Sequence, residues 1–152
     1  MSSPQDTTDY IQTAIDNIHT VINNYKDFIG FKSLSKTDDA FIPVYPAITI
    51  EFSSMTSEWK SMPKRMTLYM NFDITCYYAN ISDKNAREGI RNLLSKVANC
   101  LRENWNINGF ATELGSEITS VQPYVLASGD EVVIGGVISL TVNKVISVTL
   151  SS

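Results

Sequence analysis

The clearest pattern along the chain is a regular alternation of apolar and polar residues over positions 66–78. The apolar positions are Met66, Leu68, Met70, Phe72, Ile74, Cys76 and Tyr78. Successive side chains of a β-strand point to opposite faces of a sheet, so a period of two indicates one buried face. This segment therefore predicts a long, half-buried strand.

Two other segments repeat their apolar residues at steps of three and four, which is the spacing of one face of an α-helix. The first runs from about residue 6 to residue 29, and the second from about residue 83 to residue 105. The first stripe consists of Ile11, Ala14, Ile15, Ile18, Val21, Ile22, Tyr25, Phe28 and Ile29. The second consists of Ile90, Leu93, Leu94, Val97, Leu101 and Trp105. Both segments predict helices that bury one face.

Residues that begin and end helices flank both stripes. The N-cap candidates of the first helix are Asp6, Thr7, Thr8 and Asp9. Gly30 can adopt the left-handed conformation that ends this helix. Ser82 and Asp83 offer the cap of the second helix, and residues 106–109 end it.

The rest of the chain predicts further strands. Residues 31–46 indicate an extended connection, residues 47–52 a short strand and residues 53–63 a loop. Two β-branched runs, residues 118–127 and 131–150, flank Ser128, Gly129 and Asp130 and so predict a hairpin. The second run forms either one long strand or two strands with a bend near Asn143 and Lys144.

The predicted order of helix, two strands, helix and further strands is typical of an α+β domain. Strands with one polar face suit an antiparallel sheet that is covered on one side. We therefore expect a two-layer sandwich, with a mainly antiparallel sheet, two helices packed on one face and a long β-hairpin. The chain length predicts a single domain over residues 1–152, with a flexible polar N-terminus at about residues 1–6.

The charge balance argues against a protein that grips nucleic acid. The net charge is -4 and the isoelectric point is about 4.9, whereas duplex binding requires a basic face. Charged residues make up 18% of the chain, which favours surfaces buried against partners, although many uncharged Ser, Thr and Asn residues would give the same figure. The sequence carries no signal peptide and no membrane-spanning run, so we expect a cytoplasmic origin and no membrane contact.

The sequence also lacks the motifs of enzyme active sites, such as GxSxG, GxxxxGK[ST] and HExxH. His19 has no local catalytic partner, and Glu51 and Asp73 lie on the polar faces of their predicted strands. Cys76 and Cys100 lack the spacing of a zinc site or a disulfide framework, which favours two small buried residues. We therefore expect no catalytic residue, no metal site and no cofactor.

Two segments are candidates for contacts with partner proteins. The loop before the alternating strand places large apolar side chains beside basic ones, a combination that is enriched where proteins meet. The candidate interface residues are Trp59, Lys60, Met62, Lys64 and Arg65 in this loop, and Val132, Ile134, Gly135 and Gly136 in the closing hairpin. In the alternative interpretation, Trp59 packs back onto the sheet, and the glycine pair marks a bulge, a bend or a close approach of another backbone.

The second helix also begins with a basic stripe formed by Lys84, Arg87 and Arg91. A solvated helix face explains such a stripe, and a docking surface for an acidic neighbour is the alternative.

The length of the predicted strands favours an assembly. A strand of thirteen to fifteen residues spans roughly 45 Å, whereas a domain of this size is about 35 to 40 Å across. Part of the strand would therefore project, and its unpaired edges would need cover. Sister copies in an oligomer provide such cover.

With these features the chain resembles the tail terminator proteins of long-tailed bacteriophages and the related tail-completion and neck proteins. The resemblance covers most of the chain, from the N-terminal helix and the strand that follows Pro46 to the central helix and the closing hairpin. Its most family-like piece is the tract Phe72, Asp73, Ile74, Thr75, Cys76, Tyr77 and Tyr78, followed by a capped helix.

The resemblance implies a structural virion protein that forms a homo-oligomeric ring, expected to be a hexamer. Such a ring caps the tail tube, ends its polymerisation and joins the tail to the head-neck connector. The implied partners are other copies of the chain, the tail tube protein and a head-completion or connector protein, while DNA passes through the lumen without specific binding. The protein would be made in the host cytoplasm and found in the virion.

Three other functions remain open from the sequence. Another head-completion, neck or tail-tube subunit would share the same pattern. A small enzyme that uses scattered carboxylates or a serine would show a deep cleft that gathers Glu51, Asp73 and His19. A monomeric ligand-binding domain would show a large apolar pocket.

Overall fold

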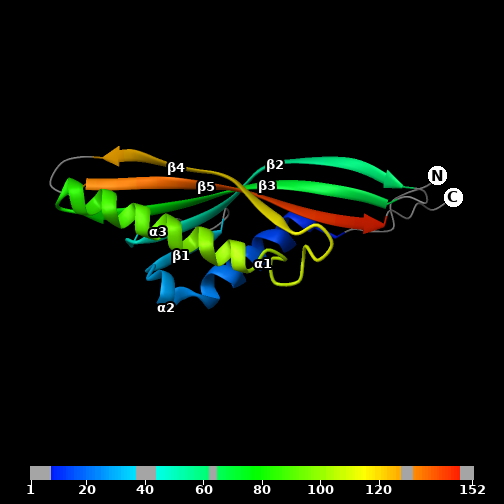
Figure 1. Ribbon diagram of the computed structural model, residues 1–152, viewed down its shortest axis with the longest axis horizontal. Coiled ribbons are helices and arrows are strands. Elements are labelled where there is room, and N and C mark those ends of the chain that lie inside the picture. Colours follow the sequence, from blue (N-terminus) through cyan, green and yellow to red (C-terminus); the bar gives the residue numbers. More distant parts are fainter. Residues whose placement is uncertain (1–7, 37–43, 62–64, 128–131, 148–152) are drawn as a thin grey trace.

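The computed structural model describes residues 8–36, 44–61, 65–127 and 132–147. Within these residues a five-stranded sheet forms one layer, and helices lie against one of its faces (Figure 1). Across the sheet the strands are β1 (Ser33–Lys36), β2 (Ala47–Ser61), β3 (Arg65–Asn80), β5 (Val132–Ser147) and β4 (Ser116–Ala127). β1 pairs with β2 in parallel and the other neighbours are antiparallel, so the predicted α+β sandwich with a mainly antiparallel sheet is confirmed.

The first predicted helix is divided into α1 (Tyr10–Asn24) and α2 (Lys26–Ile29). Among the predicted caps, Asp9 begins α1, since its Oδ1 accepts a hydrogen bond from the Gln12 backbone N at 3.0 Å. Gly30 ends α2 at a φ of 82°, as the sequence predicts. The prediction of one unbroken helix from residue 6 was wrong in its bounds: the helix begins at Tyr10 and breaks at Tyr25. Two asparagines with low helix propensity precede the break.

α3 (Asp83–Glu103) begins at the predicted cap, because Ser82 Oγ accepts a hydrogen bond from the Asn85 backbone N at 3.4 Å. The helix ends at Glu103, earlier than predicted, and turns follow up to residue 114. Trp105 therefore lies outside the helical stripe and is 51% exposed, which corrects the prediction that it belongs to the buried face. Its ring still lies against Gly115, where an added β-carbon would approach Trp105 Cε3 to 2.6 Å.

β2 is much longer than predicted. Residues 53–61, which the sequence indicates as a loop, continue the strand and pair with β3, with register shifts between Phe52 and Ser54 and between Trp59 and Ser61. The prediction of a loop was wrong because these residues lack an apolar alternation, and such an alternation arises only where one face of a strand is buried. Likewise, β1 lies in the predicted extended connection.

The core lies between the sheet and the helices. Residues buried on the helical side of the sheet include Ile48, Ile50, Met70, Phe72, Ile74, Cys76, Ile134, Ile138, Leu140 and Val142. They contact the apolar stripes of α1 and α3 in one continuous cluster. The other face carries the polar half of the alternation, so the predicted half-buried strand at residues 66–78 is confirmed within β3.

β5 is one strand through Asn143 and Lys144, which selects the first of the two alternatives left open by the sequence. Lys144 interrupts the apolar side because it has partners there: its Nζ donates a hydrogen bond to the Phe110 carbonyl oxygen at 2.9 Å and lies 5.0 Å from the centre of the Phe110 ring. Lys144 thereby ties the turns that follow α3 to the sheet. The turn at Ser128, Gly129 and Asp130 and the N-terminus at residues 1–6 lie outside the described residues.

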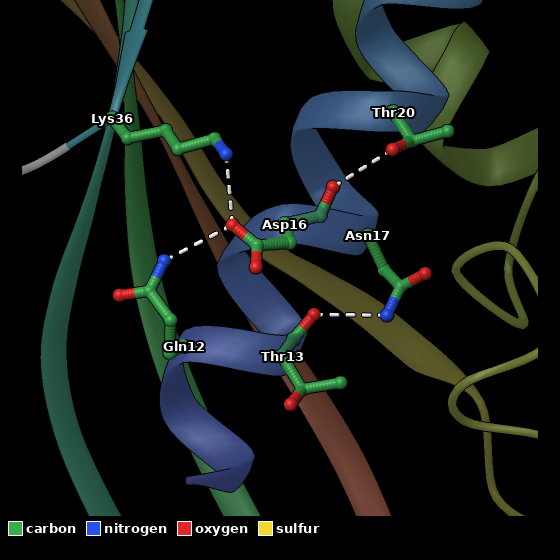
Figure 2. A network of polar contacts seen from close by, with 6 residues as sticks. All are labelled: Gln12, Thr13, Asp16, Asn17, Thr20 and Lys36. Carbon is green, nitrogen blue, oxygen red and sulfur yellow. Dashed lines mark hydrogen bonds and ion pairs between the residues drawn. The ribbon is translucent and has the colours of Figure 1, made fainter.

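Polar contacts join α1 to β1 (Figure 2). Lys36 Nζ lies 2.8 Å from Asp16 Oδ1, and Gln12 Nε2 donates a hydrogen bond to the same oxygen at 3.0 Å. Both interactions stabilise the ionised carboxylate, so they hold the pKa of Asp16 below its ordinary value of 3.8. This pairing fixes the short edge strand to the helix layer.

Candidate assembly interface

Three strands extend beyond the helices at one end of the sheet (Figure 1). We call this part the projecting ribbon and define it as residues 53–61 of β2, residues 65–70 of β3 and residues 142–147 of β5. The extension follows from element lengths. The 21 residues of α3 span about 31 Å at 1.5 Å each, whereas the 16 residues of β3 span about 53 Å at 3.3 Å each. A single layer of these helices is therefore too short to cover the sheet from end to end.

The ribbon exposes large apolar side chains. Trp59 is 57% exposed and Met55 is 43% exposed, and their register with Met66 and Met70 places both on the helical side of the sheet. On this side Met70 is buried and Met66 is half-buried, so the exposed apolar side chains are those of β2 at the edge of the sheet. Trp59 therefore lies at the surface of the sheet and not in the core.

In the part of the chain that the structure describes, the strand pairing on the outer edge of β2 ends at Ile50. β1 pairs there with residues 47–50, and no described strand lies beside residues 51–61. The stretch from residue 54 to residue 59 contains no proline and no register shift. By contrast, the free edge of β4 carries Pro123 and two register shifts, which are features that hinder strand addition.

On the opposite face of the sheet, short polar side chains bridge three strands. Asn71 Nδ2 donates a hydrogen bond to Ser54 Oγ at 2.9 Å, and Asn71 Oδ1 accepts one from Thr141 Oγ1 at 2.7 Å. Nearby, the Tyr69 hydroxyl donates to Glu58 Oε2 at 3.1 Å. These hydrogen bonds link neighbouring strands of the ribbon. The exposed side chains therefore lie on a hydrogen-bonded sheet and not on a loop.

The sequence-predicted interface residues divide into two groups. Trp59 and Arg65 are exposed in the ribbon, and Lys60 occupies the register shift near its end. Met62 and Lys64 lie outside the described residues. The remaining four, Val132, Ile134, Gly135 and Gly136, are buried within β5. The structure therefore places Trp59 and Arg65 near the same end of the sheet but on opposite faces, and it places the second group inside the fold.

The glycine pair lies where α3 packs closely on β5. An added β-carbon on Gly136 would lie 2.5 Å from Leu94 Cδ1 of α3. The register of β5 runs through both glycines without a shift, so the expectation of a bulge there was wrong. The atoms near Gly136 belong to the Leu94 side chain and not to another backbone.

The titratable groups are dispersed. Glu51 and Asp73 are directly opposite each other in the β2–β3 register, as neighbouring strands allow, but they lie on the open face. His19 belongs to α1, on the other side of the sheet. In the described part of the chain no group of three or more His, Cys, Asp and Glu side chains is arranged to hold a metal ion. The deep cleft expected for an enzyme that uses these three residues is therefore not formed.

Both cysteines are buried, as predicted from the sequence. Burial raises the pKa of the Cys76 thiol to about 12. Burial, with a smaller contribution from the charge of Glu103, raises the pKa of Cys100 to about 11. Neither thiol is poised as a nucleophile, because the reactive thiolate is the disfavoured form. Across the described ranges, no helix combines the length and apolar character needed to cross a membrane.

A groove runs between α3 and the edge strand β4. Two adjoining hollows of about 550 and 350 Å³ share Arg91 and Pro123, and together we call them the α3–β4 groove. Apolar side chains that line it are Ile90, Leu94, Val121, Pro123 and Ile134. Basic side chains that line it are Lys84, Arg87, Arg91 and Arg102. The basic stripe on the second helix was the sequence signal for this surface, whereas the apolar floor depends on the tertiary packing of α3 beside β4.

Comparisons with known proteins add no identification, since no protein-family model matches the chain and no curated protein shows significant similarity to it.

Proposed function

We propose that this protein is a structural subunit that assembles with copies of itself, and that it acts as a tail terminator of a long-tailed bacteriophage. The observation that carries the proposal is the projecting ribbon, with Trp59 and Met55 exposed beside a strand edge that no described strand pairs with. Exposed apolar side chains on an unprotected edge promote association, and soluble proteins keep such surfaces where a partner covers them.

Burial energetics support a protein partner for this ribbon. Trp and Met are among the residues enriched at protein interfaces, and a buried Trp often contributes more than 2 kcal/mol to binding. The braced strands around these residues lose little conformational freedom on binding, because hydrogen bonds already hold them in place. A rigid and apolar edge that no described strand covers suits a permanent contact between subunits.

The assignment as a tail terminator rests on the resemblance of the sequence pattern to that family. The resemblance implies the following architecture. Copies join head to tail into a closed ring, expected to be a hexamer. The ring caps the tail tube, stops its polymerisation and joins the tail to the head-neck connector, while DNA passes through its lumen. A protein of net charge -4 suits this passage, since it offers few cations to hold phosphate.

Mass measurement in solution combined with negative-stain electron microscopy of the full-length chain tests the proposal. The wild-type protein is expected to form closed rings. The double variant Met55→Ser and Trp59→Ser is expected to weaken association at least 30-fold, which corresponds to about 2 kcal/mol.

The matched control is Phe28→Ser, because Phe28 is 58% exposed but lies on α2, away from the ribbon. This control should leave ring formation unchanged. Open tubes in place of rings would assign the protein to the tail tube, and a wild-type monomer at all concentrations would reject the structural role.

A further inference from the structure

The turns between α3 and β4 contain the one asparagine of the chain that is followed directly by glycine, Asn108 with Gly109. Both residues are exposed. Asn108 has a φ of 56° and Gly109 a φ of 81°. Asparagine and glycine adopt this left-handed region at lower cost than most residues, which explains why both occur here.

An asparagine followed by glycine is the dipeptide in which the backbone most readily attacks its own side chain. The Gly109 amide nitrogen loses its proton and bonds to Asn108 Cγ, the Cγ–Nδ2 bond breaks, and the side-chain nitrogen takes up a proton and leaves as ammonia. Water then opens the resulting succinimide ring at either bond between its nitrogen and a carbonyl carbon, which gives aspartate or isoaspartate. Glycine favours the attack because it has no β-carbon to hinder it.

Hydrogen bonds restrain the reacting groups in the folded protein. Asn108 Nδ2 donates to Asn17 Oδ1 of α1 at 3.0 Å, and the Gly109 backbone N donates to Asn106 Oδ1 at 3.4 Å. The second distance is longer than usual between nitrogen and oxygen, so the attacking nitrogen is weakly held. Exposed turns also open at lower cost than packed helices and strands. The bond to Asn17 is therefore the stronger of these two restraints on the reaction.

The reaction would remove this bond between the turns and α1. Asn17 Nδ2 already donates to the Thr13 carbonyl oxygen at 2.8 Å (Figure 2), so Asn17 offers its Oδ1 acceptor to Asn108. An ionised carboxylate at position 108 only accepts hydrogen bonds, so it cannot donate to Asn17 Oδ1. Isoaspartate would also lengthen the backbone of the turn by a methylene group.

We propose that Asn108 is a site of spontaneous deamidation, with water as the co-reactant, and that the product loosens the turns after α3 from α1. The hydrogen bond to Asn17 slows the reaction in the folded protein. This proposal is independent of the proposed function, because it follows from the turn alone and involves no residue of the projecting ribbon.

Peptide mass spectrometry of the full-length protein, incubated at pH 8 and 37 °C, tests the site. The peptide that contains Asn108 should gain the mass that accompanies replacement of NH2 by OH, and part of the product should be isoaspartate. Asn104 and Asn106 are internal controls, because they lie in the same turns but precede residues with large side chains. Conversion of Asn108 no faster than that of the two controls would overturn the proposal.

The Asn17→Ala variant tests the restraint. It removes the acceptor and leaves Asn108 and Gly109 in place, so conversion should become about two- to tenfold faster, as the loss of one hydrogen bond implies. Thr20→Ala is the matched control, since Thr20 also lies on α1 but its Oγ1 donates to the Asp16 carbonyl oxygen. Alanine favours helices, so both variants should fold. Equal rates in Asn17→Ala and the wild-type protein would overturn the restraint by Asn17.

The Asn108→Asp variant tests the consequence. Amide hydrogen exchange of residues 107–111 should be faster in this variant than in the wild-type protein, while exchange in the middle of β3 stays the same. Unchanged exchange in the turn would overturn the claim that the product loosens it.

Discussion

At Gly136 the spacing between α3 and the sheet depends on a missing side chain. A β-carbon there would lie 2.5 Å from Leu94 Cδ1, closer than van der Waals contact allows. We expect Gly136→Ala to destabilise the fold by about 1–3 kcal/mol through overpacking, measured by urea denaturation. In the Leu94→Ala background the same substitution should cost much less, because the colliding methyl group is gone. An equal cost in both backgrounds would show that this contact is not the cause.

The buried cysteines give a second prediction for single residues. With pKa values of about 12 and 11, Cys76 and Cys100 remain protonated at pH 8, so Ellman's reagent should label neither thiol in the native protein and both after unfolding. The raised pKa values also imply a pH dependence. Thiols of the unfolded chain ionise near pH 9, whereas the buried ones do not, so stability should decrease as the pH rises from 9 towards 12. Rapid labelling under native conditions would contradict the burial of these side chains.

Between elements, the pair of Asp16 and Lys36 fixes β1 to α1. Both side chains are partly exposed, so we expect Asp16→Asn to cost less than about 1 kcal/mol at pH 7. The pKa of Asp16 is lowered in the folded state, so the stabilisation is complete above pH 3.8 and is lost as the pH falls through the folded-state pKa. Thermal denaturation of both proteins should therefore differ at pH 7 and converge near pH 2. A difference that is unchanged at pH 2 would assign the effect to packing rather than to charge.

The sequence predicted those elements whose apolar residues face the core. β3 and α3 have a regular stripe because one side of each is buried, and the N-cap of α3 at Ser82 follows local chemistry. The second half of β2 was missed for the same physical reason. No described helix packs on residues 53–61, so their sequence has no apolar alternation. They form a strand because β3 supplies the hydrogen-bonding partner.

The candidate interface was predictable only in part. Trp59 and Arg65 were identified from residue type, which reflects how interfaces are composed. The role of Val132 to Gly136 could not be assigned from the sequence. A pair of glycines allows close contact either with a partner protein or with a helix of the same chain, and the sequence does not distinguish the two. The apolar floor of the α3–β4 groove was not predictable either, since it combines residues of α3 with residues of β4 that are distant in the sequence.

Over the whole molecule, β2 carries two local costs to folding, one on the open face and one at its edge. Glu51 and Asp73 are directly opposite each other on the open face, and like charges in such cross-strand positions destabilise a sheet. Among the described strands, none pairs with the outer edge of β2 where it carries Met55 and Trp59. A sequence selected for the stability of the isolated chain would be expected to remove both features. The exposed edge that carries Met55 and Trp59 is consistent with a surface that is shaped for contact with another subunit.

The pair of Glu51 and Asp73 leads to a variant in which stability changes and assembly does not. Glu51→Gln removes the repulsion from Asp73, so it should stabilise the isolated chain by a few tenths of a kcal/mol up to about 1 kcal/mol in thermal denaturation. Glu51 lies on the open face and outside the projecting ribbon, so the same substitution should leave ring formation unchanged in sedimentation experiments. The control is Glu117→Gln, on the same face but opposite the neutral Thr141, which should change neither property. Equal effects of the two substitutions on stability would show that no repulsion from Asp73 acts on Glu51.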